Sequence, residues 1–166
     1  MHCVLIGFKA SGKTTVGRQL ATSLGRDFLD TDEAICTVYG GGQAHEIYQT
    51  LGEPRFRALE HQIITSLKPT QNTVIATGGG VVLNPLNIAY LKTLGSIIFL
   101  NTRLEIIAHR LQVLNRPSPF LDLQSVYLQR QALYFRAADQ VIDCEDESPM
   151  CIADKLYQTI RATNGE

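Results

Sequence analysis

The chain has 166 residues, of which 45% are hydrophobic, and this length and composition predict one globular domain with a substantial core. A net charge of −1, without any run of Lys or Arg, argues against a nucleic-acid partner. No apolar stretch approaches the roughly 18 residues that span a bilayer, and the N-terminus lacks the pattern of a signal peptide. We therefore expect a cytoplasmic protein without a membrane partner, which most simply acts as a monomer.

The four cysteines, Cys3, Cys36, Cys144 and Cys151, are scattered along the chain and form no C-x-x-C pair. The four histidines show no metal-ligand spacing with them. This pattern favours buried free thiols in a reducing compartment over disulfides or a zinc site.

The first elements in the chain are a predicted strand at residues 2–6 and a predicted helix at residues 13–24. Between them, Gly7 to Thr14 match G-x-x-x-x-G-K-[ST], the loop that surrounds the phosphates of a nucleoside triphosphate with backbone N–H groups. A strand before this loop and a helix after it are the context that the motif requires. We therefore predict a P-loop and an enzyme that handles phosphates.

Each residue type of this loop has a physical reason. Gly7 and Gly12 permit backbone angles that side chains disfavour, and the start of the helix favours an anion. Lys13 adds a positive charge for the outer phosphates, and the Thr14 hydroxyl can ligate Mg²⁺. The alternative is an ordinary glycine turn capped by Ser11, which the two flanking elements make the weaker interpretation.

Short apolar runs then alternate with segments of helical periodicity, and four further strands are predicted at residues 27–30, 73–77, 96–100 and 140–143. This alternation predicts an α/β fold of three layers, α/β/α, with a five-stranded, mostly parallel sheet. In such sheets ligands bind outside the carboxyl ends of the strands. The residues that directly follow each strand are therefore the candidates for function.

Asp30 and Asp32 follow the second predicted strand. If the strand continues through both, their side chains point to the same side and face one site. Beside a triphosphate, one carboxylate can hold Mg²⁺ and the other can accept a proton from an attacking hydroxyl. The alternative is that Thr31 and Asp32 cap a helix at residues 33–39.

Three consecutive glycines, Gly78, Gly79 and Gly80, follow the third predicted strand. Glycines allow the backbone to approach a ligand closely, and their N–H groups suit a hydroxyl or a phosphoryl group. The alternative is a flexible segment at the end of the strand, in which the ordering of three glycines costs conformational entropy without any gain in binding.

Three arginines lie farther along the chain. Arg57 is on a predicted helix at residues 53–67, where Glu60 is three residues away, and a surface ion pair is the usual meaning of that spacing. Arg130 lies on a predicted helix at residues 123–137, where a solvated face is the simpler interpretation. Arg116 lies in a proline-marked loop, where it is able to close over phosphates as a lid.

Together these residues resemble the shikimate kinase family, in order and at similar spacing over nearly the entire chain. The segments that carry the resemblance are Gly7-Phe8, Gly12 to Arg18, Phe28 to Asp32, Gly52-Glu53, Phe56-Arg57, Thr77 to Gly80, Arg116-Pro117 and Arg130 to Tyr134. The ordered set is much more specific than the P-loop alone. Nucleoside monophosphate kinases share the loop but do not usually follow their second strand with Asp-x-Asp.

The resemblance implies a P-loop kinase fold and transfer of the γ-phosphoryl group of ATP to the 3-hydroxyl of shikimate. The products are shikimate 3-phosphate and ADP, in the pathway to aromatic amino acids, and the cofactor is Mg²⁺. It also implies acceptor-binding helices at about residues 32–67 and a mobile lid at about residues 112–122. The small-molecule partners are thus shikimate and ATP.

The resemblance further implies a role for each matching residue. Asp32 is the expected general base, Arg57 and Arg130 hold the acceptor's carboxylate, and Arg110 packs against adenine. The expected sites, by role, are as follows: catalytic, Lys13, Asp32 and Arg116; nucleotide, Gly7, Ala10, Ser11, Gly12, Lys13, Thr14, Thr15, Arg110 and Arg116; acceptor, Asp32, Arg57, Gly78, Gly79, Gly80 and Arg130; metal, Thr14 and Asp30.

Two other functions are compatible with the same residues. One is a related small-molecule kinase with a different acceptor, such as gluconate or a nucleoside monophosphate. The other is a nucleotide-binding switch or an inactive regulatory subunit, against which the intact Lys13, Asp32, Arg57 and Arg130 argue.

Overall fold

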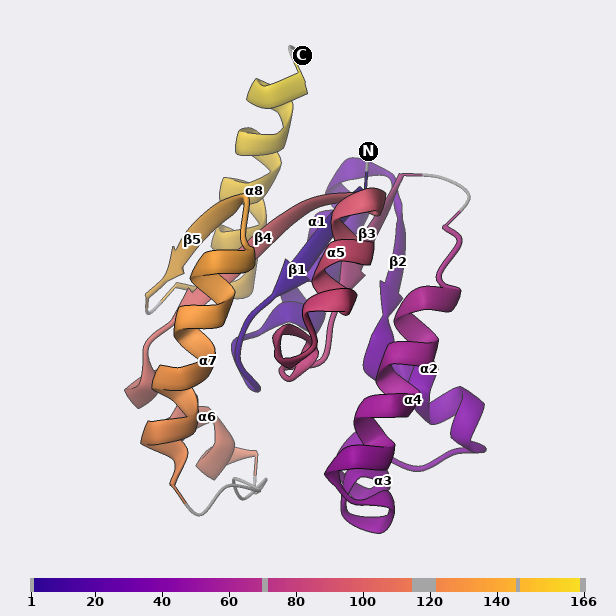
Figure 1. The fold of residues 1–166 in the computed structure, drawn as a ribbon. Helices are drawn as coiled ribbons and strands as arrows, with labels where there is room; N and C mark the ends of the chain where they lie inside the picture. Colours follow the sequence, from indigo (N-terminus) through magenta and orange to yellow (C-terminus); the bar gives the residue numbers. More distant parts are fainter. Residues whose placement is uncertain (1, 70–71, 115–121, 146, 165–166) are drawn as a thin grey trace.

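A computed structural model describes residues 2–69, 72–114, 122–145 and 147–164. Five strands form a single parallel sheet in the order β2-β3-β1-β4-β5, with helices on both faces (Figure 1). The strands are β1 (His2–Ile6), β2 (Asp27–Asp30), β3 (Thr73–Ala76), β4 (Gly95–Thr102) and β5 (Gln140–Cys144). The predicted three-layer α/β fold is therefore confirmed, and every strand pair is parallel.

The described helices connect these strands. They are α1 (Lys13–Leu24), α2 (Thr31–Tyr39), α3 (Ala44–Leu51), α4 (Glu53–Ser66), α5 (Pro85–Leu94), α6 (Leu104–Val113), α7 (Leu123–Ala137) and α8 (Pro149–Asn164), with a short 3₁₀ turn, η1 (Val81–Leu83). None of them is both long and apolar enough to cross a membrane.

Alternate residues of the central strand β1 serve two separate cores, as the two-residue period of a strand requires. Cys3 and Leu5 pack with α1 and α8 on one face of the sheet. Val4 and Ile6 pack with residues of α4, α5, α6 and α7 on the other face. A third, smaller cluster joins α2, α3 and α4 beyond the edge of the sheet, around Ile35. This third cluster fixes α4 relative to α2, and both helices carry candidate site residues.

The second strand ends at the residue predicted for it. Strand β2 ends at Asp30, and helix α2 begins at Thr31. Asp30 is the N-cap of this helix, because its Oδ1 accepts hydrogen bonds from the backbone N–H groups of Asp32 at 2.9 Å and Glu33 at 3.4 Å. The strand therefore does not continue through Asp32, so the condition under which both carboxylates would point the same way along one strand is not met. The assignment of the helix cap to Thr31 or Asp32 is wrong.

All four cysteines are free, but only two are buried as expected. Cys3 and Cys144 lie in the core between the sheet and the helices α1 and α8, whereas Cys36 is half-buried and Cys151 is exposed. Burial raises the pKa of the Cys144 thiol to about 11, so this thiol stays protonated at neutral pH.

Candidate active site

The P-loop lies between β1 and α1, at the carboxyl edge of the sheet. Gly7 and Gly12 both have positive φ, at 154° and 97°, and Ala10 also has positive φ, at 63°. An alanine in this conformation is uncommon. Arg110 Nη1, on helix α6, donates to the Ala10 carbonyl at 3.1 Å. The loop thus adopts the backbone angles that its glycines permit, directly before the start of α1.

Lys13 is folded back into this loop. Its ammonium donates to the carbonyl oxygens of Gly7 and Phe8, both at 2.9 Å, and to Ser11 Oγ at 3.4 Å. Burial lowers the pKa of Lys13 to about 8, and the nearby carboxylates of Asp32 and Asp30 counteract part of that effect. A cation is therefore held at the position where the outer phosphates of a bound nucleotide belong.

Thr14 and Asp30 meet across the junction of α1 and β2. Thr14 Oγ1 donates to Asp30 Oδ2 at 2.7 Å. Both are hard oxygen ligands, which suit Mg²⁺, and this ion usually keeps several waters and takes phosphate oxygens as further ligands. No cluster of three or more His, Cys, Asp or Glu residues suited to a metal ion occurs among the described residues. The residues present therefore fit Mg²⁺ beside the P-loop.

Asp32 lies in the first turn of α2 with its carboxylate in the site. Burial is the main cause that raises its pKa to about 6, and the neighbouring Asp30 raises it further. Lys13 and Arg57 act in the opposite direction. A carboxylate with a pKa near 6 is mostly ionised at pH 7 and is basic enough to accept a proton.

Each of the three glycines after β3 lies against a different functional group. A Cβ built on Gly78 would come within 2.7 Å of Asp32 Oδ1 and 3.0 Å of Glu60 Oε1. A Cβ on Gly79 would lie 3.0 Å from the backbone nitrogen of Lys9 in the P-loop. The three glycines therefore allow the neighbouring groups to approach the backbone closely. We call the backbone of Gly78, Gly79 and Gly80 the floor of the site.

Arg57 lies over the last of these glycines. A Cβ on Gly80 would come within 2.2 Å of the Arg57 guanidinium. Arg57 Nη1 donates to both oxygens of Glu60 at 3.0 Å, and the Glu60 side chain is only 1% exposed. The interpretation of this spacing as a surface ion pair is therefore wrong: Glu60 is buried and Arg57 is half-buried, because α4 packs on α2 and α5.

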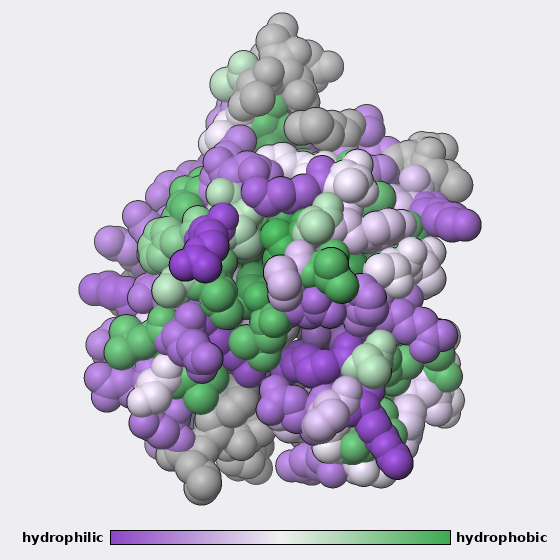
Figure 2. Space-filling model, in the orientation of Figure 1, coloured by the Kyte–Doolittle hydropathy of each residue, from purple (hydrophilic) through white to green (hydrophobic). Residues whose placement is uncertain are grey.

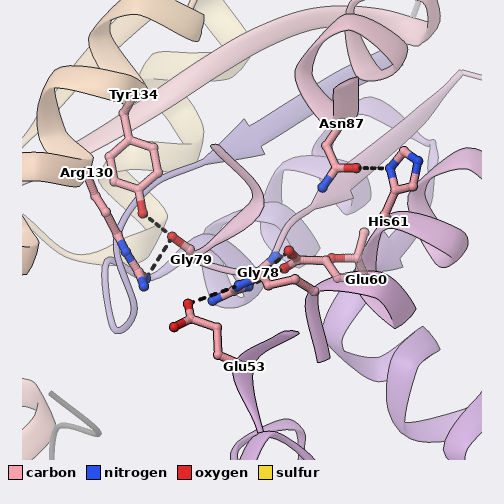
Figure 3. A network of polar contacts seen from close by, with 10 residues as sticks. Glu53, Glu60, His61, Gly78, Gly79, Asn87, Arg130 and Tyr134 are labelled. Carbon is pink, nitrogen blue, oxygen red and sulfur yellow. Dashed lines mark hydrogen bonds and ion pairs between the residues drawn. The ribbon is translucent and has the colours of Figure 1, made fainter. Parts of the chain in front are cut away.

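Arg130 and Tyr134, one turn apart on α7, share a single acceptor (Figure 3). Arg130 Nη1 donates to the carbonyl oxygen of Gly79 at 3.3 Å, and the Tyr134 hydroxyl donates to the same oxygen. The Arg130 guanidinium also lies over the ring of Phe8, 5.7 Å from its centroid. Arg130 is only 5% exposed, so the solvated-face interpretation is wrong for this residue too.

The candidate groups converge although they come from distant parts of the sequence. The charges of Lys13, Arg57 and Glu60 all act on the Asp32 carboxyl, and Arg57 helps burial to lower the pKa of Arg130. Figure 2 shows strongly hydrophilic side chains gathered low on this face, between the part covered by α7 and the part covered by α3 and α4. One site thus contains a phosphate loop, a buried carboxylate and two guanidinium groups.

Three further residues were expected to bind the nucleotide: Arg110, Thr15 and Arg116. Arg110 on α6 lies beside the P-loop, with Nη1 3.7 Å from the position of a Cβ on Gly12. Thr15 is exposed in the first turn of α1. Arg116 lies outside the described residues, as does most of the expected lid at residues 112–122.

Sequence reasoning assigned no role to two residues of this site. Glu60 is the buried partner of Arg57, and Tyr134 shares the Gly79 carbonyl with Arg130. Helical spacing offered a signal for both, because Glu60 is three residues after Arg57 and Tyr134 is four residues after Arg130. Spacing alone did not distinguish a buried contact from a solvated one.

Comparisons with known proteins show which family the chain resembles. The family model described as shikimate kinase matches residues 9–161. A shikimate kinase of Thermodesulfovibrio yellowstonii is 40% identical over 99% of this chain and 98% of its own, and one of Caldanaerobacter subterraneus is 39% identical over 95% of this chain and 94% of its own.

Solved structures give the same result. Shikimate kinase from Acinetobacter baumannii in complex with shikimate superposes with a TM-score of 0.86 at 33% identity, over 98% of this chain and 93% of its own. Shikimate kinase from Aquifex aeolicus superposes with a TM-score of 0.81 at 29% identity, over 99% of this chain and 98% of its own. By sequence and fold, the chain belongs to the shikimate kinase family.

Proposed function

We propose that this chain catalyses the reaction of its family, the transfer of the γ-phosphoryl group of ATP to the 3-hydroxyl of shikimate, with Mg²⁺. One observation carries the proposal: Asp32, Arg57 and Arg130 meet around the three glycines directly beside the P-loop. The relative from Acinetobacter baumannii was solved in complex with shikimate, which supports the same acceptor here.

The P-loop binds the nucleotide. Its backbone N–H groups and the Lys13 ammonium bind the phosphates and compensate the charge that develops during transfer. Thr14 and Asp30 hold Mg²⁺, directly or through its water shell. When bound, this ion neutralises charge on the phosphate oxygens.

The floor of glycines and the two arginines bind the acceptor. Shikimate is a small anionic triol, so a selective pocket needs planar cationic groups for the carboxylate and hydrogen-bonding groups for the hydroxyls. Arg57 and Arg130 supply the guanidinium groups, and the backbone of Gly78, Gly79 and Gly80 approaches the ring closely enough to bond its hydroxyls. Binding at both ends orients the reacting hydroxyl toward the phosphate.

Asp32 is the general base of this proposal. Its carboxylate lies against Gly78, and the positive charges of Lys13, from the P-loop, and of the acceptor arginine Arg57 both lower its pKa. From there it accepts the proton of the 3-hydroxyl as the oxygen attacks the γ-phosphorus and the bond to the ADP oxygen breaks.

Two further arginines complete the proposal. Arg110 packs against adenine, from its position beside the P-loop. Arg116 descends with a lid over residues 112–122 and stabilises charge in the transition state, so that Arg116→Ala lowers kcat by about a hundredfold. We further propose that the chain acts in the cytoplasm, where ATP is supplied, and as a monomer; light scattering of the purified protein tests the monomer.

The experiment that tests this function compares acceptors. ADP release by the purified protein is measured with ATP and Mg²⁺ in the presence of shikimate, gluconate or a nucleoside monophosphate. We expect turnover that depends on shikimate. Equal or faster turnover of another acceptor would show a related kinase, and ATP binding without turnover would show a nucleotide-binding switch.

A further inference from the structure

The acceptor pocket already contains a carboxylate of the protein itself. Glu53 lies in the first turn of α4, with Oε1 3.7 Å from Arg57 Nε. Burial raises the pKa of the Tyr48 hydroxyl and the Glu53 charge raises it further, and the same charge acts on Arg130. Figure 3 shows the Glu53 carboxylate reaching toward the guanidinium that Glu60 holds from the other side. A carboxylate of the protein thus lies beside Arg57 and acts electrostatically on Arg130 and Tyr48.

Arg57 offers different edges of its guanidinium to Glu60 and Glu53. Glu60 occupies Nη1 with both of its oxygens. The opposite edge, Nε with Nη2, is the one that pairs with a carboxylate in a two-point contact. Glu53 lies at this edge, yet Nε is buried and has no hydrogen-bond partner within the part of the chain that the structure describes. Glu53 therefore lies at the edge of Arg57 that suits the acceptor's carboxylate, but it makes no hydrogen bond to Nε there.

We propose that Glu53 is a specificity-determining residue that occupies the acceptor's carboxylate position in the empty pocket and is displaced when shikimate binds. The inference rests on the proposed function, because it concerns the carboxylate of that acceptor. An anionic acceptor replaces Glu53 with a carboxylate that can make the two-point contact. An acceptor without a carboxylate cannot replace Glu53 as the negative charge that compensates the two arginines.

Exposure distinguishes the two glutamates that contact Arg57. The Glu53 side chain is 52% exposed, whereas that of Glu60 is 1% exposed. An exposed ion pair contributes little to stability, so Glu53 turns outward to water at small cost. Loss of Glu60 would instead leave the Arg57 guanidinium without its buried anchor. The two residues are therefore expected to affect acceptor binding in opposite directions.

The test measures the affinity of the purified protein for shikimate by isothermal titration, in wild type, Glu53→Gln and Glu60→Gln. We expect Glu53→Gln to bind shikimate about two- to fivefold more tightly, the gain that corresponds to removal of one exposed ion pair. Glu60→Gln is expected to bind more weakly. Unchanged or weaker binding by Glu53→Gln would overturn the proposal.

Two controls separate this effect from others. Glu46→Gln changes a first-turn glutamate on the neighbouring helix α3, where the new side chain still accepts from the Gln43 N–H, and it should leave shikimate affinity unchanged. The methyl ester of shikimate has no carboxylate charge, so Glu53→Gln should lose its advantage with this ligand. An equal gain with the ester would contradict competition between carboxylates, and failure of the wild type to bind shikimate would contradict the proposed function instead.

Discussion

Asp32 and Gly78 are in such close contact that only glycine fits at position 78. A Cβ on Gly78 would lie 2.7 Å from Asp32 Oδ1, well inside van der Waals contact. We therefore expect Gly78→Ala to move the Asp32 carboxylate and to lower kcat about 10- to 100-fold, since small displacements of a reacting group have effects of this size. Steady-state kinetics with saturating shikimate and ATP measure it. A kcat equal to that of the wild type would show that Asp32 is not the base.

Gly80→Ala should affect a different kinetic constant. The new methyl group would lie within 2.2 Å of the Arg57 guanidinium, which must move away from the floor of the pocket. We expect the KM for shikimate to rise about tenfold or more, with a much smaller change in the KM for ATP, because removal of one partner from a hydrogen-bonded charge pair costs on the order of 2 kcal/mol or more. Initial rates with each substrate varied in turn give both constants. An increase confined to the KM for ATP would contradict the placement of Arg57 in the acceptor pocket.

The pKa values of Asp32 and Lys13 predict a bell-shaped pH profile. Burial raises the pKa of Asp32 to about 6, so the base becomes protonated and activity falls as the pH drops through that value. Burial lowers the pKa of Lys13 to about 8, so the phosphate-binding charge is lost as the pH rises through that value. We expect kcat/KM for shikimate to be highest between these limits, since this ratio reports groups of the free enzyme.

Asp32→Asn checks the acid limb of that profile. An amide cannot accept the proton, so turnover should nearly vanish, and the residual rate should no longer fall as the pH drops through 6. Circular dichroism of the variant serves to confirm that it is folded. Retention of most of the wild-type activity would exclude Asp32 as the general base.

Tyr134 is expected to act as a positioning residue through Gly79. Its hydroxyl donates to the Gly79 carbonyl that also accepts from Arg130, and its ring stacks on Phe99 at a centroid distance of 5.0 Å. Tyr134→Phe keeps the ring but removes the donor, so we expect the KM for shikimate to rise about three- to tenfold with little change in kcat, as for the loss of one hydrogen bond.

A second buried tyrosine on α7 provides a matched control for Tyr134→Phe. The Tyr127 hydroxyl donates to the Thr102 carbonyl at 2.9 Å, on strand β4. Tyr127→Phe should lower thermal stability by a similar amount but leave the KM for shikimate unchanged. Equal effects of the two variants on the KM would indicate that Tyr134 contributes only to the stability of the fold.

Much of the fold and part of the site were predictable from the sequence, because both depend on local patterns. Apolar runs and helical periodicity located the five strands to within two residues at each end. The carboxyl ends of parallel strands lie at one edge of a sheet, so the P-loop and the glycines at 78–80 had to be neighbours.

The remaining features depend on tertiary packing, which local patterns do not contain. An i,i+3 pair such as Arg57 and Glu60 looks the same in sequence whether it is exposed or buried. Burial follows from the packing of α4 between α2 and α5. The start of α2 at Thr31 was also missed, because Asp30 satisfies the first N–H groups of α2 and so allows the helix to start two residues earlier than expected.

The most direct test of the account is a double-mutant cycle on Arg57 and Arg130, with the dissociation constant for shikimate as the measurement. If both guanidinium groups hold the same carboxylate, Arg57→Ala and Arg130→Ala each weaken binding, and the double variant loses less than the sum of the two free-energy changes, by more than about 0.5 kcal/mol. Additive losses, or binding that neither variant weakens, would show that the two arginines do not share one ligand and would contradict the account.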